Sequence, residues 1–214
     1  MGFSYLTYMR QLNSFFILVM FTTIMVGQSS IDKSIDASGL KEVTIILNNT
    51  FQIEISNNLE DKIIFSVQSE GEYQDRILIN TQRLETSVVL QDDVQPFSES
   101  HNDKLSAHKV FAVKVKIQIP PYLKVVVQSR TASLNITGKL KHLFAELNSG
   151  DCLLKSYIGE AMINTFTGNI DIYTKDASIN ASTRSGEIKG KMTFGRYPIE
   201  LKSISGNINI HNMK

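Results

Sequence analysis

The stretch SGDCLL, residues 149–154, carries the strongest structural signal in this chain, because close copies of it recur along the C-terminal part of the sequence. TASLNI starts at Thr131, TGNIDI at Thr167, SGEIKG at Ser185 and SGNINI at Ser205. The copies begin 18, 18, 18 and 20 residues apart. A fixed period of this length is typical of stacked coils that bury their apolar sides against each other. The repeat therefore predicts an all-β fold, a short-strand β-solenoid with parallel β-helix-like coils of about 18 residues.

Four mostly apolar columns accompany these copies. The two downstream columns are Leu134, Cys152, Ile170, Ile188, Ile208 and Ile136, Leu154, Ile172, Gly190, Ile210; the two upstream ones are Val125, Leu143, Ala161, Ile179, Ile199 and Val127, Ala145, Ile163, Ala181, Leu201. Residues spaced by two lie on one face of a strand, so we expect side chains 18 positions apart to stack in one dry interior. Gly150, Gly168, Gly186 and Gly206 then mark the corner between the two strands of a coil. A phosphate-binding loop would need a following helix, and strand-like alternation follows instead.

The end of the repeat is expected to be irregular and open. Gly190 leaves a gap in one column, and the coil of residues 177–196 carries the two-residue insertion. Because the chain ends at Lys214, shortly after the last copy, the final coil is expected to present an open strand edge. This C-terminal edge is a possible place of self-association.

The N-terminal part divides into three segments. Residues 1–27 are predicted to be a secretory signal peptide, because Arg10 precedes an apolar run of twelve residues from Phe15 to Val26, too short to span a bilayer. The start codon is either Met1 or Met9. Residues 28–40 are polar and predicted to be a linker, residues 41–120 an N-terminal part of packed β-strands, and residues 121–214 the solenoid repeats.

Composition argues against several function classes. The chain has 22 Lys and Arg against 21 Asp and Glu, and without residues 1–27 the two counts are equal at 21, so no basic face for nucleic acid is expected. The single cysteine, Cys152, lies in an inward column and is interpreted as a buried hydrophobe. The four histidines lack the short spacing of a metal site. We therefore assign no catalytic, cofactor-binding or metal-binding residue and expect no cofactor.

One polar cluster merits an alternative interpretation. Asp151, Asp171 and Glu187 lie on the outer face of successive predicted coils. Glycoside hydrolysis uses two carboxylates about 5–10 Å apart, so these three side chains allow a small polysaccharide-active β-helix enzyme. A solvated polar ladder is the simpler interpretation, because such enzymes also have an aromatic-lined groove and this chain has no tryptophan.

An outward column is unexpectedly apolar. Val126, Phe144 and Met162 occupy it in the first three coils, and Asn180 and Glu200 in the last two. We expect the strands of residues 41–120 to cover the three apolar side chains; the alternative is a contact patch.

The order of segments resembles a known family. The chain resembles the putative adhesin family of bacterial envelope proteins, domain of unknown function 4097. The resemblance lies in an exported N-terminus, a set of short strands, and then IPPYLKVVV from Ile119, LNSGD from Leu147 and TFTGNI from Thr165. The resemblance implies a β-solenoid-like exported protein without established catalytic residues. We therefore expect a non-enzymatic envelope or surface interaction module that is periplasmic, on the cell surface or secreted. Its partner is expected to be a protein or glycan of the envelope or surface, with no nucleic acid and no membrane span after signal cleavage; the alternatives are the enzyme above and an end-to-end self-assembling envelope scaffold.

Overall fold

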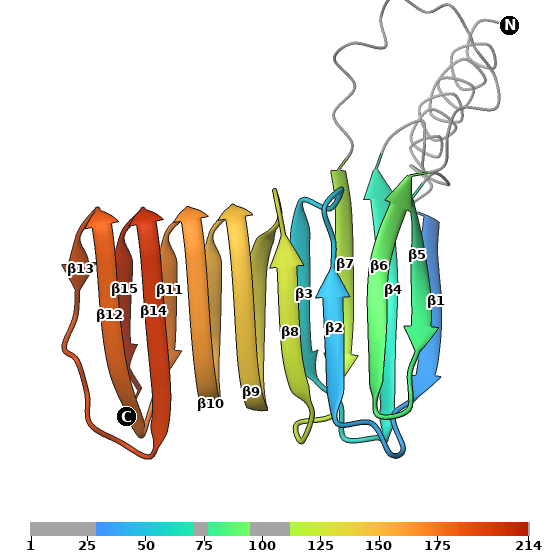
Figure 1. Ribbon diagram of the computed structural model, residues 1–214, viewed down its shortest axis with the longest axis horizontal. Coiled ribbons are helices and arrows are strands. Elements are labelled where there is room, and N and C mark those ends of the chain that lie inside the picture. The colour runs from blue at the N-terminus through green and yellow to red at the C-terminus, as the bar shows by residue number, and fades with distance from the viewer. Residues whose placement is uncertain (1–28, 71–76, 95–111, 214) are drawn as a thin grey trace, which may run out of the picture.

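The computed structural model describes residues 29–70, 77–94 and 112–213, and these residues form an all-β structure (Figure 1). The predicted signal peptide lies outside them. Within the described ranges, no helix is long and apolar enough to cross a bilayer. The strands are β1 (Ser29–Asp36), β2 (Glu42–Ile46), β3 (Gln52–Asn57), β4 (Lys62–Glu70), β5 (Ile77–Arg83), β6 (Ser87–Val94), β7 (Ala112–Ile119), β8 (Lys124–Ser129), β9 (Ser133–Ser149), β10 (Cys152–Thr167), β11 (Ile170–Thr174), β12 (Ala177–Ser185), β13 (Ile188–Lys189), β14 (Tyr197–Ser205) and β15 (Ile208–Asn212).

The strands form two facing layers that share the long strands β9 and β10 (Figure 1). The front layer has the order β5-β6-β2-β8-β9-β10-β14-β12, and the back layer has the order β1-β4-β7-β3-β9-β10-β11-β15-β13. β9 and β10 contribute to both layers, and each contains a glycine with positive φ, Gly138 at 107° and Gly159 at 142°. Most pairs are parallel, and the antiparallel ones involve β1, β4, β5, β6 and β7.

The predicted columns fill the space between the layers. Leu134, Cys152 and Ile170 pair side by side in parallel register, and all three are fully buried. The upstream columns are buried throughout, and the downstream ones are buried except at Ile188, which is 38% exposed, and at Gly190. One hydrophobic core runs from Ala37 to Ile210, so it continues across the predicted boundary at residue 120.

The order of the last strands differs from the prediction. Ile170 pairs with Ile208 rather than with Ile188, and Ile188 pairs with the other side of Ile208. The last coil, β14 and β15, therefore lies between β10/β11 and β12/β13, and the open end of the stack is formed by β12 and β13 (Figure 1). The prediction that the C-terminal strand forms the open edge is wrong.

Burial of apolar area explains this insertion. β14 and β15 carry four buried apolar residues, Ile199, Leu201, Ile208 and Ile210. Between two other coils, these side chains are covered by a neighbouring coil on each side. The coil of β12 and β13 is poorer in apolar area, and β13 is only two residues long. A short, polar coil is better suited to the end of a stack, where it faces water.

The N-terminal strands extend the layers instead of covering them. β2 pairs with β8, and β3 pairs with β9, edge to edge. None of the described strands lies over Val126, Phe144 and Met162, which are half-buried on the front surface. The expected cover is therefore wrong for the described residues. Residues 29–36, within the predicted linker, form β1 and pair antiparallel with β4.

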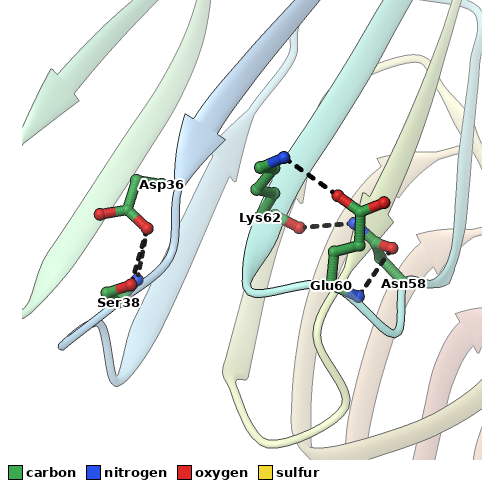
Figure 2. A network of polar contacts seen from close by, with 5 residues as sticks. All are labelled: Asp36, Ser38, Asn58, Glu60 and Lys62. Carbon is green, nitrogen blue, oxygen red and sulfur yellow. Dashed lines mark hydrogen bonds and ion pairs between the residues drawn. The ribbon is translucent and has the colours of Figure 1, made fainter.

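Two hydrogen-bonded turns fix the loops at the N-terminal end of the stack (Figure 2). Asp36 accepts hydrogen bonds from the backbone N–H of Ser38 at 3.1 Å and from its hydroxyl at 2.7 Å, and these bonds lower the pKa of the Asp36 carboxyl. In the β3–β4 turn, the Asn58 side chain donates to the Lys62 carbonyl and accepts from the Glu60 N–H, and Lys62 Nζ lies 3.1 Å from Glu60 Oε2 (Figure 2). Such local bonds are the usual reason that Asx and Ser residues are found in turns.

The corner between β2 and β3 lacks the Ser-Gly phrase and is held by a side chain from β6. The buried carboxylate of Asp92 accepts the backbone N–H groups of Asn48 at 2.9 Å and Asn49 at 2.6 Å. These partly buried N–H groups gain a charged acceptor, so Asp92 takes the place of the Ser-Gly phrase at this corner.

Candidate functional site

The polar residue after each corner glycine has a structural role. Asp151 Oδ1 accepts the Asn169 N–H at 2.8 Å, Asn169 Oδ1 accepts the Asn207 N–H at 2.9 Å, and Asn207 Oδ1 accepts the Glu187 N–H at 2.9 Å. Each side-chain oxygen thus binds the backbone of the neighbouring coil. This ladder explains the Asp or Asn at this position in three of the copies, whereas Glu187, at the end of the ladder, contributes only its backbone N–H.

The structure does not bring all three carboxylates considered for catalysis together. Asp151 and Glu187 lie at the two ends of the ladder, three strand spacings or about 14 Å apart. Paired carboxylates of glycosidases lie within about 10 Å of each other, so this pair is too far apart. Asp171 lies on the strand next to Asp151 and two residues further along, about 8 Å away between Cα atoms. Its Oδ1 accepts the Asn209 amide at 2.8 Å, so this carboxylate already joins two coils. Glu187 forms an ion pair of 3.0 Å with Lys189.

Within the described ranges, the cysteine and both histidines are buried or lie against a neighbouring side chain. Cys152 is fully buried, and this burial raises the pKa of its thiol, which keeps it protonated. His211 stacks on Tyr173 with ring centroids 4.3 Å apart, and His142 lies 3.5 Å from Glu160. Among residues 29–70, 77–94 and 112–213, no three His, Cys, Asp or Glu side chains form a group that could hold a metal ion.

A groove of about 860 Å³ crosses the outer surface of the front layer beside the corners. It runs across β8, β9, β10, β14 and β12, so its lining comes from five coils. Two rows of side chains line it. The inner row is Gln128, Glu146, Asn164, Lys202 and Ser182, and the outer row is Arg130, Asn148, Phe166, Ile204 and Arg184.

Hydroxyls of two buried residues and one half-buried residue hold the corners along this groove. Thr165 Oγ1 and Ser203 Oγ both donate to the Gly168 carbonyl, at 3.2 and 3.3 Å, and Thr183 Oγ1 donates to the Gly206 carbonyl at 2.9 Å. These residues form a fifth inward column, with Ser129 and Leu147, that the sequence analysis did not assign. The bonds fix the backbone from which the outer row projects.

The outer row has an apolar centre and basic ends. Phe166 is 53% exposed and Ile204 is 43% exposed, and they lie on the neighbouring strands β10 and β14. Arg130 and Arg184 flank them, four strand spacings or about 19 Å apart. The sequence analysis missed all four residues. Their only signal in the sequence is their shared position directly before the Ser/Thr of each copy.

The fold is shared with a solved structure. A putative cell adhesion protein from Clostridium sporogenes superimposes with a TM-score of 0.64 at 16% sequence identity, covering 87% of this chain and 100% of that one. A putative adhesin from Bacteroides fragilis matches with a TM-score of 0.40 at 13% identity, covering 87% and 98%. No protein-family model matches the chain, and no curated protein matches it. The first likeness shows the fold alone.

Proposed function

We propose that this protein is an exported, non-enzymatic β-solenoid that acts as an interaction module of the bacterial envelope or surface and binds its ligand in the groove. The parallel, in-register pairs from β8 to β15 support the solenoid description. The signal-peptide pattern of residues 1–27 supports export. The neighbour of the same fold is named a putative cell adhesion protein, which agrees with a binding role.

The exposure of Phe166 and Ile204 carries the proposal. An apolar pair that is about half exposed, on a rigid surface and within a groove, is typical of a binding site. On the same two strands, the adjacent outward column of the front layer is polar, with Asn164 on β10 and Lys202 on β14. Apolar residues are therefore not required on this surface for folding.

The experiment compares groove and control variants in binding to isolated bacterial envelopes and to a panel of immobilised glycans. We expect the double variant Phe166→Ala, Ile204→Ala to bind roughly tenfold or more weakly, because aromatic and aliphatic anchors dominate such interfaces. Phe194→Ala is the matched control, since Phe194 is 97% exposed on the loop after β13, outside the groove. Equal loss in both variants, or none in the groove variant, rejects the groove as the binding site.

Two other functions remain testable in the same material. The variant Asp151→Asn, Asp171→Asn, Glu187→Gln keeps one side-chain acceptor at each position, so loss of glycan cleavage with intact folding would favour the enzyme. A scaffold that assembles end to end would use the open edge of β12 and β13, and light scattering would then show a mass above the monomer that Ile188→Lys, which places a charge on β13, lowers.

A further inference from the structure

The charges that line the groove favour an anionic ligand. The groove is lined by three basic side chains, Arg130, Arg184 and Lys202, and by one acidic side chain, Glu146, an excess of two positive charges. Lys202 Nζ lies 2.5 Å from Glu200 Oε1, so its charge is partly neutralised. The guanidinium groups of Arg130 and Arg184 have no hydrogen bond or ion pair to any described residue. A guanidinium binds a carboxylate or sulfate through two parallel hydrogen bonds, so both ends of the groove are suited to such groups.

The spacing of the two arginines requires a long ligand. They lie about 19 Å apart across the strands, with Asn148, Phe166 and Ile204 between them. A small molecule cannot contact both ends, whereas an extended chain can. Such a chain would lie perpendicular to the strands and pass over the apolar pair.

The backbone of the groove argues against a peptide as this chain. Extended peptides bind sheets mainly by pairing with free N–H and C=O groups at an edge. β8, β9, β10 and β14 each have a paired strand on both sides, so their backbone groups are already used. Of the five strands of the groove only β12, at the Arg184 end, has an unpaired edge, so recognition along the rest of the groove must come from side chains.

The side chains match a saccharide. Gln128, Asn148 and Asn164 provide carboxamides, each with donors and an acceptor, which is what sugar hydroxyls require. The exposed ring of Phe166 provides an apolar face for the C–H side of a sugar ring. We propose that the groove takes an extended acidic polysaccharide whose carboxylate or sulfate groups bind Arg130 and Arg184. This inference rests on the proposed function and names the ligand class for the same groove.

Isothermal titration of the purified chain with oligogalacturonates of increasing length tests the proposal. We expect affinity to rise with length until the oligomer reaches both arginines and then to level off. The fully methyl-esterified oligomers have the same sugars without the charge and should bind at least about tenfold more weakly. Arg130→Gln and Arg184→Gln should each weaken binding by roughly tenfold and reduce its dependence on salt.

Arg196→Gln is the matched control, because Arg196 precedes β14 at the end of that strand away from the groove and loses the same charge. Equal binding of charged and esterified oligomers, or an equal loss in Arg196→Gln, overturns the proposal. Tighter binding of a polyglutamate peptide of the same length overturns it in favour of an acidic peptide. If envelope binding depends on Phe166 and Ile204 while oligogalacturonate does not bind, the acidic polysaccharide is rejected and the groove remains the binding site.

Discussion

Four of the five copies have a corner glycine, and the first has Ala132 in its place. Gly150 has a φ of 125°, and a Cβ at this position would lie 2.3 Å from the Ala132 carbonyl oxygen of the neighbouring coil. Gly168 would meet the Gly150 carbonyl oxygen at 2.1 Å in the same way. Gly150 is therefore needed both for the backbone angle and for the close approach of adjacent coils, and Gly186 and Gly206 for the close approach alone.

We predict that Gly150→Ala lowers the free energy of unfolding by more than about 2 kcal/mol, because strain at positive φ of about 1–3 kcal/mol adds to the backbone clash. Urea unfolding measures the loss. Gly39→Ala is the control, since Gly39 has a φ of 77° but no atom within 4 Å of the added Cβ. Its loss should be about 1 kcal/mol. Equal losses would show that contact between coils does not restrict the corner.

The residues that could be predicted from the sequence are those that packing constrains. Leu134, Cys152 and Ile170 recur at a fixed period because each must fill the same interior position. The outer row of the groove has no such constraint, and in chain order it reads Arg130, Asn148, Phe166, Arg184 and Ile204, without a constant residue type. A search for repeated residue types therefore finds the core and misses the groove.

At the scale of strands, the sequence predicted which residues share a register but not which coils are neighbours. The apolar columns of all coils are alike, so any coil can pack on any other. The choice depends on the difference in apolar area between the coil of β12 and β13 and the coil of β14 and β15. Such a difference is small for each residue and is summed over a whole coil, which is why the repeat pattern alone did not reveal it.

Engineered disulfides test the strand order directly. Asp171 and Asn209 are register partners on β11 and β15, so their Cα atoms lie about 4.8 Å apart, within the range for a disulfide. Asp171 and Lys189 are separated by two strand spacings, about 10 Å, which is too far. We predict that Asp171→Cys, Asn209→Cys forms a disulfide under mild oxidation, as measured by peptide mass mapping.

The variant Asp171→Cys, Lys189→Cys is the comparison for this experiment and should stay reduced. Cys152 is fully buried and should not interfere. Sequential stacking of the coils would give the opposite result, a disulfide in the second variant and none in the first.

Across the whole molecule, stability should decrease from the middle of the stack to its open end. β9 and β10 have strand partners on both sides in both layers, whereas β12 pairs only with β14, and β13 pairs only with β15. We predict the slowest amide hydrogen exchange in β9 and β10 and the fastest, among the described strands, in β13. Mass spectrometry of peptic peptides provides the measurement, and uniform protection along the stack would contradict it.

The insertion of β14 and β15 also separates the order of synthesis from the order of assembly. β12 and β13 are synthesised before the strands they pair with, because those partner strands, β14 and β15, come from residues 197–212. A chain interrupted before Tyr197 would therefore lack two coils of the stack. The coil of β14 and β15 would be missing, and the coil of β12 and β13 would have no strand to pair with.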